Sequence, residues 1–176
     1  MPGRTLRYQE QQDAVRIFSG ALNYTRIRIF EQKRWPGILA SISTCLTKSP
    51  PVRHNAVALG NWLFFSRSLQ TSGGDDTLRD MSWLMHELTH AWQYQHIGLR
   101  YIVQALAAQL KLGSKAYDYG GEAGLLAARA RGQRLVEFNV EQQADIVCHF
   151  YARWKRGEPC DAWLPFLHEI NPHILL

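Results

Sequence analysis

The segment His86-Glu87-Leu88-Thr89-His90 places two imidazoles four residues apart with a carboxylate between them. In a helix each residue turns about 100° and rises about 1.5 Å, so the two histidines share one face, one turn apart. Two imidazoles in that arrangement can bind one metal ion, and Glu87 then stands beside the ion, where it can take a proton from water. The motif therefore predicts a hydrolytic metal centre, with Zn²⁺ (one ion) as the expected cofactor.

A catalytic zinc usually has three protein ligands, and two residues compete for the third position. Glu141 and Asp145 are four apart on a predicted helix, so Glu141 can bind the metal while Asp145 accepts the free N–H of a ligand histidine. His96 has the spacing of an H-E-x-x-H-x-x-G-x-x-H pattern, but Gln93 occupies the glycine position. On an unbroken helix His96 lies about 15 Å along the axis from His86. The spacing favours Glu141 and leaves His96 open only if the helix breaks near residue 93.

The elements that must position these residues indicate an α+β class, because strands dominate the first part of the chain and helices the rest. One domain is expected over residues 1–176, with strands mainly over 25–66 and helices mainly over 76–170. A first helix is predicted over 8–18, ended by Ser19-Gly20, and residues 25–31 alternate as a strand does. Residues 56–59 and 62–65 flank Gly60-Asn61, which predicts a hairpin.

The motif helix shows an apolar stripe with helical spacing and begins near Asp75 or Asp76, either of which could cap it. The stripe comprises Leu78, Met81, Met85, Leu88 and Trp92. Further helices are predicted over 101–112, 123–131 and 139–157, followed by a last short helix capped by Asp161 and extending through Ile170.

Composition excludes several classes of protein. The chain has 176 residues, 46% of them hydrophobic, which is enough for a packed core and rules out a disordered tail. No apolar run reaches the about 20 residues of a membrane span, and no secretory signal is visible, so synthesis in the cytoplasm and no membrane partner are expected. The net charge of +5 comes without a recognised nucleic-acid motif, so nucleic acid is not an expected partner either.

The histidine motif and the later Glu141-Gln142-Gln143-Ala144-Asp145 together resemble the gluzincin pattern, in its compact minigluzincin form. Four stretches also resemble small bacterial Vgr-related proteins associated with type VI and contractile-injection secretion: residues 15–20, 83–93, 116–119 and 138–145. The resemblance implies a zincin-like fold, with a small antiparallel or mixed sheet packed on the motif helix and a second ligand-bearing helix behind it. It also implies an edge strand that holds extended peptide; the candidate is residues 62–66, with Trp62, Leu63 and Phe64 contacting substrate.

The activity implied by the resemblance is zinc-dependent hydrolysis of peptide bonds, with Glu87 as general base and then acid. Tyr117, Tyr119 and His149 are the candidates for stabilising the oxyanion, and the sequence does not choose among them. The implied partners are a peptide or protein substrate and secretion spike or effector proteins. Such a protein would be an effector delivered outside the cell by a contractile secretion system, or a processing protease. The alternative is a non-catalytic zinc-containing adaptor or chaperone for a spike or effector.

Overall fold

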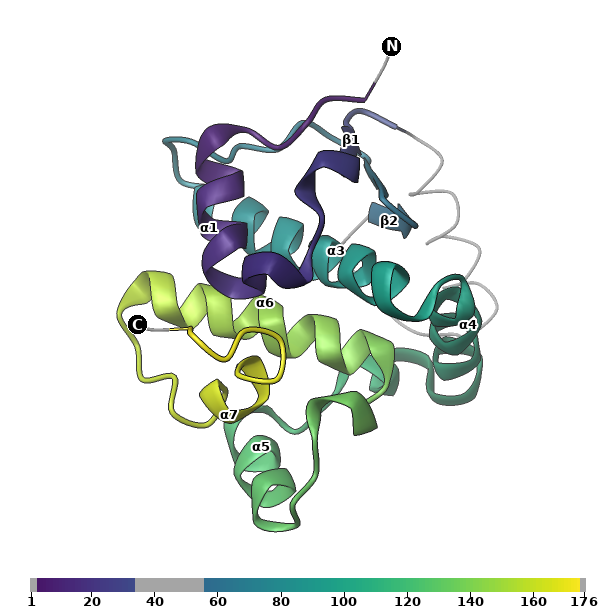
Figure 1. Cartoon of the computed structure of the whole chain (residues 1–176), viewed down its shortest axis with the longest axis vertical. Helices are drawn as coiled ribbons and strands as arrows, with labels where there is room; N and C mark the ends of the chain where they lie inside the picture. The colour runs from purple at the N-terminus through teal and green to yellow at the C-terminus, as the bar shows by residue number, and fades with distance from the viewer. Residues whose placement is uncertain (1–2, 34–55, 175–176) are drawn as a thin grey trace.

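The structure is a computed structural model, and it describes residues 3–33 and 56–174 (Figure 1). Its α-helices are α1 (Tyr8–Phe18), α3 (Thr77–Ile97), α4 (Arg100–Leu112), α5 (Gly121–Ala130), α6 (Val140–Arg156) and α7 (Leu164–Leu167). Short 3₁₀ turns cover Ser19–Ala21, Tyr24–Arg26, Gly113–Tyr117 and Leu135–Glu137. Among these elements no helix is both long and apolar enough to cross a bilayer.

The strands are β1 (Arg28–Phe30), β2 (Ala56–Leu59) and β3 (Trp62–Phe65), and they form a mixed sheet in the order β1-β3-β2. β2 and β3 pair antiparallel, with Leu59 opposite Trp62, which confirms the predicted hairpin. Gly60 in its turn has φ +64°, and a Cβ there would lie 3.1 Å from the Tyr94 ring. Both the backbone angle and the space therefore require glycine at this turn.

Two expectations about the strands are wrong. Residues 24–26 form a 3₁₀ turn instead of strand, because the Asn23 side chain accepts a hydrogen bond from the Thr25 backbone N–H and holds a turn there. The strand over 62–66 is not an edge: within the described sheet β3 is the middle strand, paired with β1 on one side and β2 on the other. Its backbone groups are occupied by both neighbours, so β3 cannot add a further strand.

The two helices that carry the chemistry have well-defined ends, and α6 has the predicted extent. Asn139 caps α6 by accepting hydrogen bonds from the backbone N–H groups of Glu141 and Gln142, and Gly157 ends it at φ +69°. Asp76 is the N-cap residue of α3, but its side chain makes no capping hydrogen bond and instead pairs with Arg79 at 2.8 Å. The final helix is shorter than predicted: it begins after Trp163, not Asp161, and Pro165 lies in its first turn.

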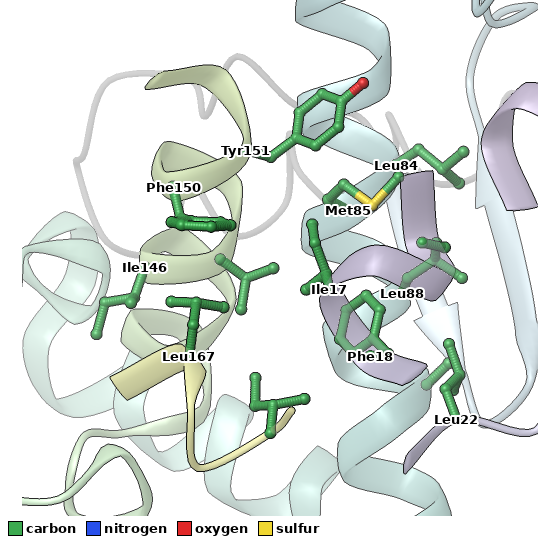
Figure 2. Close-up of a cluster of buried hydrophobic side chains, with 14 of the residues drawn as sticks. Ile17, Phe18, Leu22, Leu84, Met85, Leu88, Ile146, Phe150, Tyr151 and Leu167 are labelled. Carbon is green, nitrogen blue, oxygen red and sulfur yellow. The ribbon is translucent and has the colours of Figure 1, made fainter. Parts of the chain in front are cut away.

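α3 runs through the middle of the molecule, between α1 and α6 (Figure 1). Its apolar residues are buried on more than the one predicted stripe, since Leu84 and Ala91 are as inaccessible as Met85 and Leu88. Side chains from several elements meet in one cluster (Figure 2), including Ile17 and Phe18 of α1, Leu84, Met85 and Leu88 of α3, Ile146 and Phe150 of α6, and Leu167 of α7. Core packing on both sides of α3 therefore fixes the helix that carries the histidine motif.

Candidate metal centre

Three buried side chains from α3 and α6 converge on one point. Their ligand atoms all lie within 4.8 Å of one another: one nitrogen each of His86 and His90 and one carboxylate oxygen of Glu141. Glu141 Oε2 is 3.6 Å from His86 Nε2 and 3.4 Å from His90 Nε2. His90 and Glu141 are 6% and 4% exposed, so the group faces protein rather than open solvent. The predicted assembly of two helices around one site is confirmed.

Asp145 fixes the orientation of His86. Its Oδ1 atom lies 2.9 Å from His86 Nδ1, and because an ionised carboxylate only accepts, the imidazole donates from Nδ1. In the neutral ring, Nε2 of His86 is then the nitrogen without a proton and can bind a cation. The four-residue spacing of Glu141 and Asp145 thus places them as predicted, one toward each side of the His86 ring.

Gln93 fixes the orientation of His90, a role that the sequence did not lead us to predict. Its Oε1 is 2.8 Å from His90 Nδ1, while its Nε2 donates to the Val140 carbonyl at 2.9 Å and to Gln143 Oε1 at 3.0 Å. With both amide protons given away, Gln93 must accept from His90 Nδ1, so the neutral His90 ring presents Nε2 to the centre. The available signal was the position of Gln93, three residues after His90 and therefore on nearly the same helical face.

The ligand set suits a metal ion, because two imidazole nitrogens and one carboxylate oxygen converge on one point, with the two Nε2 atoms 3.2 Å apart. Burial by itself would lower the pKa of both imidazoles, but the nearby carboxylates outweigh it and raise both pKa values, so positive charge is favoured between these groups. Burial by itself would raise the pKa of Glu141, but the adjacent His90 and His86 imidazoles outweigh it and hold that pKa below its ordinary value. Negative charge is thereby retained in a buried place, and His86, His90 and Glu141 can bind a metal ion.

His96 does not take part in the centre. α3 continues without a break through Ile97, and the exposed His96 ring bonds the Trp92 carbonyl of its own helix at 2.8 Å. The alternative that required a break near residue 93 is therefore wrong, since Gln93 lies inside the helix and supports His90.

Glu87 stands next to the centre with its carboxylate unused by the protein. It is 4% exposed, and no described residue gives it a hydrogen bond. Burial raises its pKa, with Glu141 and Asp145 adding to the rise and the two imidazoles opposing it. A carboxylate with a raised pKa beside a cation site is suited to exchange protons near neutral pH.

Of the three candidates for an additional donor, Tyr119 and His149 form a linked pair. Trp163 Nε1 donates to the Tyr119 hydroxyl at 3.3 Å, and that hydroxyl lies 2.7 Å from His149 Nδ1. The phenol proton has no other acceptor among the described residues, so it goes to Nδ1 and His149 carries its own proton on Nε2. Burial lowers the pKa of His149, which keeps the ring neutral. His149 is thus a neutral donor, and Tyr119 is occupied in orienting it.

His149 lines a cavity of about 330 Å³ between α3 and α6, together with Leu78, Ser82, Trp83, Cys148 and Ala152. Ser82 and His149 are each one helical turn away from His86 and Asp145, so the cavity lies next to the centre along the same pair of helices. Tyr117 is placed differently: its ring stacks against His86, with ring centroids 6.4 Å apart.

The three residues of β3 that were predicted to contact substrate have different surroundings. Trp62 is 55% exposed, Leu63 is fully buried, and Phe64 stacks on Phe30 with ring centroids 4.7 Å apart. Leu63 cannot contact a substrate from the core. The hairpin instead meets the centre through Tyr101, whose hydroxyl donates to the Ala58 carbonyl at 2.8 Å. The Tyr101 ring stacks against His90, with ring centroids 6.1 Å apart.

Fold and site together define an α+β protein with a buried His-His-Glu group able to hold a metal ion. No protein-family model matches the chain. It is similar to the type VI secretion system spike protein VgrG2b of Pseudomonas aeruginosa, with 26% identity over 155 residues. That alignment takes in 85% of this chain but only 13% of the spike protein.

The fold is also similar to a solved structure, the effector domain of Pseudomonas aeruginosa VgrG2b. The TM-score is 0.60 at 22% sequence identity, over 93% of this chain and 83% of that domain. The chain thus spans most of the length of that domain but only a small part of the length of the spike protein.

Proposed function

We propose that this protein is a zinc-dependent metallopeptidase of the minigluzincin type, with a zincin-like fold. The observation that carries the proposal is the meeting of His86, His90 and Glu141 in one buried group with the unused carboxylate of Glu87 beside it. A structural metal site has no need of an adjacent carboxylate with a raised pKa, whereas a hydrolytic one does. Two imidazoles and one carboxylate are a common ligand set for catalytic zinc.

A zinc ion held by these residues would lower the pKa of a water molecule toward about 7 and polarise a substrate carbonyl. Glu87 would accept a proton from the attacking water and return it to the leaving amine as the carbon–nitrogen bond breaks. Asp145 and Gln93 keep the two imidazoles in the tautomer that presents Nε2. His149 donates from its own Nε2 to the carbonyl oxygen as negative charge develops there, and Tyr119 holds it in that tautomer.

The biological setting we propose is type VI secretion, with the enzyme acting as an effector on a peptide or protein substrate outside the producing cell. The support is the similarity to the effector domain of VgrG2b in both sequence and fold. A spike protein or another effector is the corresponding partner for delivery.

The deciding experiment compares the native protein with Glu87→Gln on a bacterial lysate, using terminal labelling to detect new N-termini and elemental analysis to measure bound metal. We expect both proteins to carry one zinc ion and only the native protein to create new termini. Equal cleavage by Glu87→Gln would refute the role of Glu87. A zinc-loaded native protein that cleaves nothing would favour a non-catalytic adaptor, and absence of metal from both would refute the centre itself.

A further inference from the structure

The outer face of α4 is apolar and uncovered among the described residues. Val103 and Leu106 are 68% and 55% exposed, and Leu99, just before the helix, is 65% exposed. At about 100° per residue these three lie within about 60° of one another around the axis. Tyr101 lies on the opposite side of the helix and is buried against β2 and His90. We call the set Leu99, Val103 and Leu106 the outer face of α4.

Cations flank this face, and acidic groups are missing from the sequence around it. Arg100 and Lys111 are exposed and lie about 60–80° round the helix from Val103, on one side of the outer face. Exposed Lys115 follows in the next turn. The chain contains no Asp or Glu between Glu87 and Asp118, although it has 15 acidic residues in all. An apolar face with cations along one side and no acidic residue nearby in the sequence is an arrangement by which an amphipathic helix lies in the headgroup region of a bilayer.

The hairpin also exposes apolar side chains. Leu59 and Trp62, which flank the hairpin turn, are 43% and 55% exposed. The turn is attached to the start of α4, since the Gly60 backbone N–H donates to the Tyr101 hydroxyl at 2.9 Å. The hairpin is thus held on the Tyr101 side of α4, opposite the outer face, and its exposed side chains are not part of that face.

We propose that the outer face of α4 docks this protein on the surface of an anionic lipid bilayer. Charge complementarity selects that occupant: the exposed cations Arg100, Lys111 and Lys115 beside the face would pair with anionic headgroups, and a neutral apolar partner would not use them. The protein lies on the bilayer and does not cross it, since the 13 residues of α4 span only about 20 Å. This departs from the expectation of no membrane partner, which rested on the lack of a spanning segment.

Docking in this way places the metal centre close to the lipid surface. Tyr101 contacts His90 from the inner side of the same helix, so the centre lies about one helix diameter, or about 10 Å, from the bilayer. Substrates held at that surface would be favoured. The docking itself does not depend on hydrolysis, so it can be tested on the full chain whether or not the proposed peptidase activity is found.

The test is flotation of the native protein with vesicles of phosphatidylcholine alone and of phosphatidylcholine mixed with phosphatidylglycerol. We expect binding only to the mixed vesicles, weakening as salt is raised. Val103→Ser with Leu106→Ser should weaken it at least about tenfold, and Arg100→Ala with Lys111→Ala about fivefold for each cation removed. The matched controls are Leu126→Ser with Val136→Ser and Arg129→Ala with Arg131→Ala, which change exposed residues elsewhere.

Circular dichroism and thermal melting of each variant establish that these surface changes leave the fold intact. The proposal is overturned if the native protein does not float with the anionic vesicles, or if the control variants lose binding as much as the α4 variants. Concentration-dependent self-association in ultracentrifugation, lost in Val103→Ser with Leu106→Ser and unaccompanied by vesicle binding, would instead assign the face to a second copy of this chain.

Discussion

Gln93 Oε1 accepts a hydrogen bond from His90 Nδ1 at 2.8 Å, while the amide protons of Gln93 go to the Val140 carbonyl and to Gln143 Oε1 in the first turn of α6. One side chain therefore sets the tautomer of a candidate ligand on α3 and attaches that ligand to the helix that supplies Glu141. The metal site and the contact between the two helices are stabilised by the same residue.

Replacing Gln93 with Ala should weaken metal binding about 10- to 100-fold, because His90 loses the partner that fixes its ring and Nε2 lone pair. The measurement is competition for zinc with a chromophoric chelator. His96→Ala is the matched control, since His96 is an exposed histidine on the same helix that bonds only its own backbone. If His96→Ala weakened zinc binding as much as Gln93→Ala, the third ligand would have to be reconsidered.

Metal should stabilise the native protein through Glu141. Zinc at about 100 times its dissociation constant is expected to add about 2.7 kcal/mol to the free energy of unfolding. Removing the Glu141 carboxylate with Glu141→Ala should abolish most of that gain, because the imidazoles alone make a weaker site. Thermal unfolding with zinc and with chelator measures the difference. An unchanged zinc-dependent gain in Glu141→Ala would remove Glu141 from the ligand set.

The hydrogen bonds that link Trp163, Tyr119 and His149 predict that changing His149 lowers turnover without loss of zinc. His149→Ala should lower kcat about 100-fold, the cost of removing one oxyanion donor, with zinc content unchanged. Tyr119→Phe should lower kcat less, because His149 remains but its tautomer is no longer fixed. Tyr117→Phe provides the comparison, since Tyr117 lies against His86. The ¹⁵N shifts of His149 report its tautomer directly, and a proton on Nδ1 in the native protein would contradict the assignment.

The pairing of Asp80 with Arg67 lets us predict how the free energy of unfolding changes as the pH falls into the acid range. Burial by itself would raise its pKa, but hydrogen bonds from Arg67 and from the Gln70 backbone N–H outweigh burial and lower it. A carboxylate with a lowered native pKa stabilises the fold fully above its unfolded value of about 4, and that stability is lost as pH falls through the lower native value.

Arg67→Ala should therefore cost about 2 kcal/mol at neutral pH and flatten the decline of unfolding free energy below about pH 4. Urea unfolding across that pH range measures both effects. Arg79→Ala is the control, because Arg79 Nε is 3.4 Å from Asp80 and its stronger pairing is with Asp76. An acid slope that is steeper in Arg67→Ala than in the native protein would contradict the argument.

Helical periodicity predicted the parts of the site that depend on spacing along one helix. The pairs His86/His90 and Glu141/Asp145 each share a face, so their placement followed once both segments were assigned as helices. The extent of α6 followed from the Asn139 cap and the Gly157 stop. The Gln93 network was not predictable in this way, because its partners lie about fifty residues away and only tertiary packing brings them together.

The order of the strands also could not be predicted from the sequence pattern. The hairpin was recognisable from Gly60-Asn61, but nothing in the alternation of residues 25–31 says on which side of the hairpin β1 pairs. β1 joins β3 in parallel, which moved residues 62–66 from the expected edge to the middle of the described sheet. Burial of Leu63 follows from that central position.

All three candidate ligands are supplied by the facing sides of α3 and α6, and both helices are seated in the same apolar cluster (Figure 2). The centre therefore cannot adjust independently of the helices, because a shift of either helix moves its ligands by the same amount. Shortening a core side chain on either helix, such as Ile146 or Leu88, should therefore weaken metal binding before the chain unfolds. The fraction of protein that carries metal should therefore be the most sensitive measure of core packing.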